Sequence, residues 1–221
     1  MVLVWYARPL FAAAGTGRIP VFLAIVAVLA GPLFVFLAIR AGRALPKSRV
    51  LAIAALQAVV AAGCALALYV QRPVYLVFTV DRFDLVLARD IAPQDLAKVT
   101  NPVFSRRPLG APEYAAALAP SDPGEARRVL DAALEGGKDL QAYPQYYVAY
   151  ASHALNALRR SKPVGAILER DAGKVARYLE SVGRAQDSVR YLPLRARSRD
   201  GVVLLDASTG IPLEVLLVDP W

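Results

Sequence analysis

Two long stretches without a charged side chain constrain this chain more than any other feature. Residues 19–39 and 50–70 are each 21 residues long and contain no Asp, Glu, Lys or Arg. A helix of that length measures about 31 Å at 1.5 Å per residue, enough to cross the hydrocarbon core of a bilayer. A chain of 221 residues has little room to bury two such helices in a soluble core. We therefore expect a membrane region over residues 1–70, with transmembrane helices at about 19–39 and 50–70.

The positions of the basic residues indicate how this region is oriented. The net charge is +8, but residues 1–70 contain six basic residues and no acidic residue. The basic and acidic residues of 71–221 are therefore nearly equal in number. This balance does not indicate a nucleic-acid-binding surface. Four of the six lie in the loop 40–49. Cytoplasmic loops are enriched in Lys and Arg. We therefore expect this loop in the cytoplasm, the helices in lipid, and residues 71–221 on the outer side of the membrane, which is the periplasm if the cell is a Gram-negative bacterium.

Residues 1–18 resemble neither a secreted domain nor a signal peptide, because the apolar run after them leads directly into the basic loop. Two spans place this short segment on the same outer side as the C-terminal domain. We expect that a further transmembrane helix precedes the two, and that Trp5 and Tyr6 form an interfacial aromatic pair at its outer end.

Small residues four apart in the apolar stretches predict close helix packing, and Pro32 predicts a kink in the first helix. The positions concerned are Ala27, Gly31, Pro32, Ala54, Ala58 and Ala62. The spacing suits packing of the two helices on each other, which we favour. It also suits a docking face for a third helix.

Residues 71–221 are long enough to form one further domain. Runs of β-branched and aromatic residues predict strands at 74–80, 83–87, 189–194, 202–206 and 212–218. Capping and periodicity predict helices beginning at Asp122 and over 152–160 and 171–182. Strands at both ends with helices between them predict an α+β domain with an antiparallel sheet.

The sequence contains no nucleotide-binding or nucleophile-elbow motif, and its single cysteine (Cys64) and histidine (His153) exclude a disulfide framework and a multi-histidine zinc site. Asp81 and Asp84 are carboxylates that acid–base chemistry or a metal would use. However, strand alternation places Arg82 on the face of Asp84, which favours a structural salt bridge. We expect a protein that is not an enzyme and holds no cofactor or metal.

Four of the ten tyrosines fall within eight residues: Tyr143, Tyr146, Tyr147 and Tyr150. Tyrosine combines apolar area with a hydroxyl group, which suits contact with a partner protein. The cluster suits an aromatic corner of the domain's own core equally well.

Two sequence blocks resemble motifs of the type IV pilin accessory protein family (TfpX/TfpZ-like). The first is RPVYLVFTVDRFDLV at 72–86, and the second comprises RYLPL at 190–194, RD at 199–200, VLLD at 203–206 and VDPW at 218–221. The resemblance assigns structural roles to Arg72, Pro73, Asp81, Arg82, Phe83, Tyr191, Pro193, Asp206, Asp219, Pro220 and Trp221. The pairs at 5–6 and 31–32 also fit the family's membrane region, although members usually show one more span before these two.

The resemblance implies an inner-membrane protein with a periplasmic domain that assists the stability, assembly or modification of a type IV pilin subunit without catalysis. The alternative is a membrane-tethered sensor or ligand-binding module outside the cytoplasm. Because its cytoplasmic part is one short loop, such a sensor would need a partner subunit.

Overall fold

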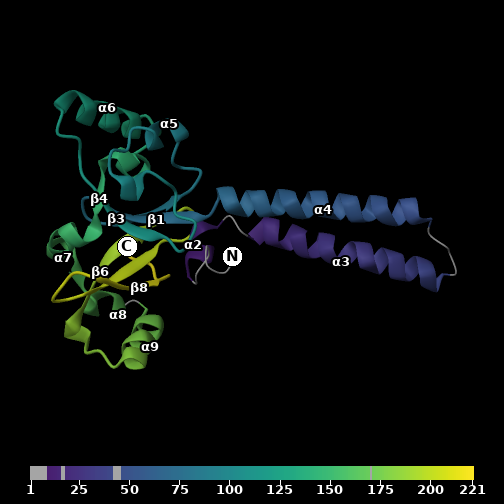
Figure 1. The fold of residues 1–221 in the computed structure, drawn as a ribbon. Helices are drawn as coiled ribbons and strands as arrows, with labels where there is room; N and C mark the ends of the chain where they lie inside the picture. The colour runs from purple at the N-terminus through teal and green to yellow at the C-terminus, as the bar shows by residue number, and fades with distance from the viewer. Residues whose placement is uncertain (1–8, 16–17, 42–45, 170) are drawn as a thin grey trace. The chain divides into compact units, whose positions relative to one another are not determined.

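The computed structural model describes residues 9–15, 18–41, 46–169 and 171–221 (Figure 1). The chain separates into two compact units. One is a helical hairpin within residues 16–71. The other is a domain formed by residues 72–221 together with the segment that ends at Gly15. Trp5, Tyr6 and residues 42–45 of the basic loop lie outside the described residues.

The hairpin contains two long helices, α3 (Arg18–Arg40) and α4 (Lys47–Val70). Both are long and apolar enough to cross a membrane, which confirms the prediction of two such helices at these positions. Most of their large side chains are exposed, as at Phe22 and Leu51. Pro32 lies inside α3 without ending the helix.

A short helix before the hairpin, α2 (Leu10–Ala14), belongs to the other unit. Leu10 is buried in the main core of the domain, and the Ser198 amide donates a hydrogen bond of 3.0 Å to the Ala13 carbonyl. Gly15 ends the helix with a φ of 69°, a conformation that favours glycine. This placement differs from the expected boundary at residue 70, because α2 packs with the domain rather than with the hairpin.

The domain is built on one mixed eight-stranded sheet, in the order β4-β3-β1-β2-β6-β7-β8, with β5 also pairing β6. The strands are β1 (Pro73–Phe78), β2 (Phe83–Leu87), β3 (Glu113–Ala117), β4 (Tyr147–Ala149), β5 (Lys162–Pro163), β6 (Val189–Arg195), β7 (Gly201–Asp206) and β8 (Pro212–Leu216). All five predicted strands are therefore present. The prediction of a wholly antiparallel sheet is wrong, because β1 pairs β3 and β2 pairs β6 in parallel. Long crossover connections, which parallel pairing requires, join the strands of both pairs.

Side chains alternate between the two faces of the sheet, and both faces are covered. On one face, Leu76 of β1 and Leu192 of β6 share a core with α2 and with α7 (Ala154–Arg160). The opposite face has two separate cores. Tyr75 and Phe104 belong to the one over β1 to β4, and Val175 and Leu204 to the one over β6 to β8. Burial on both faces explains why β1 is a continuous apolar run.

The remaining helices connect the strands. They are α5 (Pro93–Leu96), α6 (Pro123–Leu134), α8 (Gly165–Leu168), α9 (Ala172–Val182) and the 3-10 turns η1 (Pro102–Phe104), η2 (Leu140–Ala142), η3 (Pro144–Tyr146), η4 (Tyr150–His153) and η5 (Gln186–Ser188). The Asp122 carboxylate accepts a hydrogen bond of 2.8 Å from the Glu125 amide, which confirms the predicted cap of α6. The helices predicted over 152–160 and 171–182 are confirmed as η4–α7 and α9.

Candidate functional site

The two hairpin helices approach each other closely at Gly31. A Cβ atom at this position would overlap the side-chain amide of Gln57 on α4. Gly31 is buried and Gln57 is half-buried, so glycine lets the backbone of α3 come up to a polar side chain. Gly31 therefore serves packing of α3 on α4, the alternative favoured from its spacing.

The alanines of α4 lie elsewhere on the helix. Ala54, Ala58 and Ala62 are exposed, whereas Ile53, Gln57 and Val60 are half-buried at the spacing of a helix–helix seam. The alanines therefore form a face of small side chains that α3 does not cover. The side chain of Ala27 is not among those described.

Hollows of about 420 and 380 Å³ flank the Gly31–Gln57 contact. Both are lined by Gly31, Ile53 and Gln57, and Ala54 lines the smaller one. The small side chains thus leave recesses beside the seam, each with a carboxamide on its wall. Recesses of this kind accept side chains of another apolar helix or lipid tails.

The first block of the resemblance is structural at most of its positions. The side chain of Arg72 is only 1% exposed, and its Nε donates to the Pro108 carbonyl at 3.2 Å. Pro73 and Phe83 are buried in β1 and β2. A buried guanidinium bound to a backbone carbonyl fixes the loop before β3 against the start of β1.

The polar group at the β1–β2 turn forms the predicted salt bridge. Arg82 Nε lies 3.3 Å from Asp84 Oδ1, and the Thr79 hydroxyl donates to Asp84 Oδ2 at 3.1 Å. Burial raises the pKa of the Asp84 carboxyl, and the Arg82 charge opposes this rise. Asp81 is exposed in the turn, whereas Asp84 is buried. The two carboxylates do not form a paired acid–base site.

The second block also holds strands and turns in place. Tyr191 and Pro193 are buried in β6. Asp206 ends β7, where the Arg184 guanidinium donates to its carboxylate at 2.7 Å. The Ser208 and Thr209 amides donate to the other oxygen of Asp206 at 3.0 and 3.1 Å, which fixes the loop between β7 and β8. These donors hold the pKa of Asp206 well below its ordinary value.

The C-terminal residues fold back on the domain. Pro220 is buried, whereas Asp219 is exposed and accepts a hydrogen bond from the Trp221 amide at 3.0 Å. The Trp221 indole donates to Asp200 at 3.2 Å, although the side chain remains exposed. A hydrogen bond therefore joins two segments of the second block, residues 199–200 and 218–221.

The tyrosine cluster divides between core and surface. Tyr147 and Tyr150 belong to the buried cores on opposite faces of the sheet. The Tyr150 hydroxyl donates to the Gly210 carbonyl at 2.6 Å, and that of Tyr147 donates to the Gln141 carbonyl. Burial raises the pKa of both hydroxyl groups. These two residues are unavailable to a partner, so the core alternative applies to them.

Tyr143 and Tyr146 are half-buried, with ring centroids 6.1 Å apart. The Tyr146 hydroxyl lies 3.4 Å from a Glu125 oxygen, and Lys138 Nζ lies 5.9 Å from the Tyr143 ring centroid. They form a small aromatic surface next to α6, and they are the remaining candidates for partner contact in the cluster.

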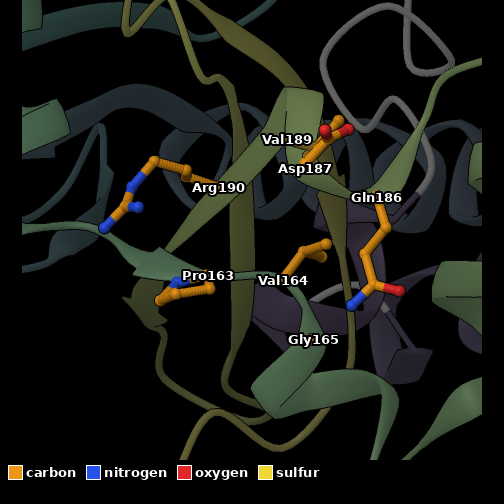
Figure 2. A pocket seen from close by; sticks show the side chains of 7 residues that line it. All are labelled: Pro163, Val164, Gly165, Gln186, Asp187, Val189 and Arg190. Atoms are coloured by element: carbon orange, nitrogen blue, oxygen red, sulfur yellow. The ribbon is translucent and has the colours of Figure 1, made fainter.

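A hollow of about 370 Å³ lies between β5–α8 and η5–β6 (Figure 2). Figure 2 shows that Gln186 reaches toward Gly165, whereas the Arg190 side chain extends away from Gln186 and Asp187. Arg190 is occupied by Ser161, whose hydroxyl accepts from its Nε at 2.6 Å. The polar groups do not converge on a common point, so this hollow is a poor binding site.

Among the described residues, no group of three or more His, Cys, Asp or Glu side chains is arranged to hold a metal ion. His153 contacts the Ser152 hydroxyl at 3.0 Å, and Cys64 is a buried free cysteine of α4.

Comparison of this chain with known protein families, with curated proteins and with solved structures gave no match.

Proposed function

We propose that this protein is a non-catalytic accessory protein of the bacterial inner membrane that assists the stability, assembly or modification of a type IV pilin subunit. In this proposal the α3–α4 hairpin spans the membrane, with the basic loop 40–49 in the cytoplasm and the mixed-sheet domain in the periplasm. The observation that carries the proposal is the face of α4 with small exposed side chains, because it offers an apolar helix a close approach within the bilayer.

The layout of the chain supports the arrangement. A hairpin returns to the side from which it starts, so α2 and β1 emerge on the same side of the membrane, as their shared domain requires. Lys47 and Arg49, in the first turn of α4, lie at the opposite end of the hairpin. The two blocks that resemble the pilin accessory family supply buried contacts of the domain, consistent with roles in folding.

The test is photo-crosslinking in pilus-forming cells. A photoreactive residue at position 58, on the exposed alanine face, is expected to give an adduct with the pilin subunit. The same residue at position 60, which faces the α3–α4 seam, is the matched control and is expected to give little adduct. Absence of a pilin adduct from position 58, at normal protein level, contradicts the proposed contact.

A second experiment tests the role rather than the contact. Deletion of the gene is expected to lower the amount of pilin or of surface pili, and the full chain is expected to restore both. An Ala58→Trp variant fills the small-residue face and is expected to restore them poorly, whereas Val59→Trp, at an exposed side chain outside the row of alanines, is the control. Normal pilin and pili in the deletion strain contradict the proposed function.

A further inference from the structure

A second hollow in the domain lies at one end of the sheet and has a volume of about 550 Å³. Its floor is formed where the parallel strands β1 and β3 end, at Phe78, Ala116 and Ala117. Crevices at the carboxyl ends of parallel strands are recurrent ligand sites, and this volume falls within the range of small-molecule pockets, about 300 to 1,000 Å³.

The opposite wall is basic. It is formed by η4 and α7, which contribute His153, Asn156, Arg159 and Arg160. His153, Asn156 and Arg160 are three and four residues apart, so they lie on one side of this helical segment. No Asp or Glu lines the hollow. Asp81 is in the turn beside it but is not one of the lining residues, and the Asp84 carboxylate is bound by Arg82.

The two arginines differ in what they already bind. The Arg159 guanidinium donates to Asn156 Oδ1 at 2.7 Å and to the Leu155 carbonyl at 3.4 Å, both on its own helix. Arg160 makes no hydrogen bond or ion pair with the described part of the chain. The Arg159 guanidinium is thus held in place without a carboxylate partner, and the N–H donors of Arg160 are available to a ligand.

We infer that this hollow binds a small organic anion, with its phosphate or carboxylate group at Arg160 and Arg159 and its apolar portion on Phe78 and the β3 alanines. Arginine donors match the oxygens of both anions in geometry and charge. The exposed Val80 and Leu118 form the apolar rim through which the ligand enters. This site is independent of the proposed membrane contact.

The probe is phenyl phosphate, titrated into the full chain in detergent and followed by calorimetry. Arg160→Gln is expected to weaken its binding about tenfold, which corresponds to about 1.4 kcal/mol, because the hydrogen bonds from a charged guanidinium to the anion are lost. Arg128→Gln, the same change of charge at an exposed site on α6, is expected to leave affinity unchanged. Benzoate replaces phenyl phosphate in a parallel titration, and the tighter binder identifies the preferred anion. Inorganic phosphate lacks the apolar ring and benzyl alcohol lacks the anionic group, so both are expected to bind more weakly than phenyl phosphate.

A second pair of variants avoids the arginines, which also stabilise the end of α7 through its dipole. Val80→Asp places a carboxylate at the rim where the side chain is 70% exposed, and is expected to weaken phenyl phosphate binding several-fold. Val103→Asp, at a side chain 64% exposed on η1, is the control. The inference is overturned if the unmodified chain does not bind phenyl phosphate or benzoate, or if both members of each pair bind equally well.

Discussion

At the scale of single residues, the buried charges of the domain are each held by specific partners. Arg72 is bound to a backbone carbonyl, and Asp84 to Arg82 and Thr79. Burying a charge without such partners is costly, so removing one partner leaves the other unsatisfied. Arg72, Arg82 and Asp84 of the first sequence block therefore contribute to the stability of the fold.

The first prediction concerns the two carboxylates of the β1–β2 turn. Asp84→Ala leaves the Arg82 guanidinium and the Thr79 hydroxyl without their acceptor, and is expected to lower the free energy of unfolding by about 1–3 kcal/mol. Asp81→Ala alters an exposed turn residue and is expected to change it by less than about 0.5 kcal/mol. Thermal unfolding followed by near-ultraviolet circular dichroism measures both. Equal effects of the two substitutions contradict the assignment.

The second prediction is a pH dependence at Asp206. Its donors lower the pKa of the carboxyl in the folded state below that of the unfolded chain, about 3.9. The carboxylate therefore contributes stability above that pH, and the contribution is lost as the pH falls toward the folded-state pKa. Asp206→Asn is expected to be less stable than the unmodified chain at pH 7, with a difference that shrinks below about pH 4. A difference that stays constant from pH 7 to pH 3 contradicts this origin.

At the scale of elements, the sequence predicts best where a local signal is strong. The long apolar runs, the capped start of α6 and the β-branched strands are all present as expected. β3 was missed because its sequence, EYAAA, lacks β-branched residues, and β4 and β5 because they are very short. The pairing of these strands depends on tertiary packing. One parallel pair includes the missed strand β3, and the other joins β2 and β6, two predicted strands whose direction of pairing no local pattern indicated.

The hollow beside Arg159 and Arg160 was not predicted either, because it also depends on tertiary packing. Phe78, Ala116 and Arg160 are distant in the sequence, and no motif joins them. Only the parallel pairing of β1 with β3, and the packing of α7 over that end of the sheet, brings them together. The tyrosine cluster illustrates the converse, because Tyr147 and Tyr150 are close in the sequence but lie in different cores.

The third prediction concerns the helix seam. Gly31→Leu is expected to separate α3 from α4, because the added side chain occupies the space of Gln57. Gly63→Leu is the control, since no atom lies within 4 Å of a Cβ built there. Thermal unfolding of the hairpin in detergent, followed by far-ultraviolet circular dichroism, is expected to shift for the first variant and change little for the second. Equal shifts contradict close packing at Gly31.

The fourth prediction tests the cap of α6. Asp122→Ala removes the acceptor of the Glu125 amide and is expected to cost about 1 kcal/mol of stability. Ser121→Ala, one residue earlier and also exposed, is expected to cost much less. Urea unfolding of both variants measures the difference, and similar midpoints contradict a capping role.

At the scale of the whole molecule, the hairpin is an insertion in the domain. The segment that ends at Gly15 and residues 72–221 form one compact unit, and the hairpin interrupts it.

The fifth prediction follows from this arrangement. A chain in which residues 16–71 are replaced by flexible Gly/Ser linkers of several lengths is expected to fold as a soluble domain. The chain beginning at residue 72 is expected to be less stable by about 1.5–3 kcal/mol, because it lacks buried Leu10. Equal stability contradicts a structural role for α2.

The position of α2 also has a consequence for the order of events during synthesis. Leu10 is made well before Leu205 and Val215, with which it shares its core. In the proposed topology, a chain in which only one helix has crossed the bilayer leaves Leu10 and that core on opposite sides. In that topology, completion of the domain core depends on the insertion of both helices.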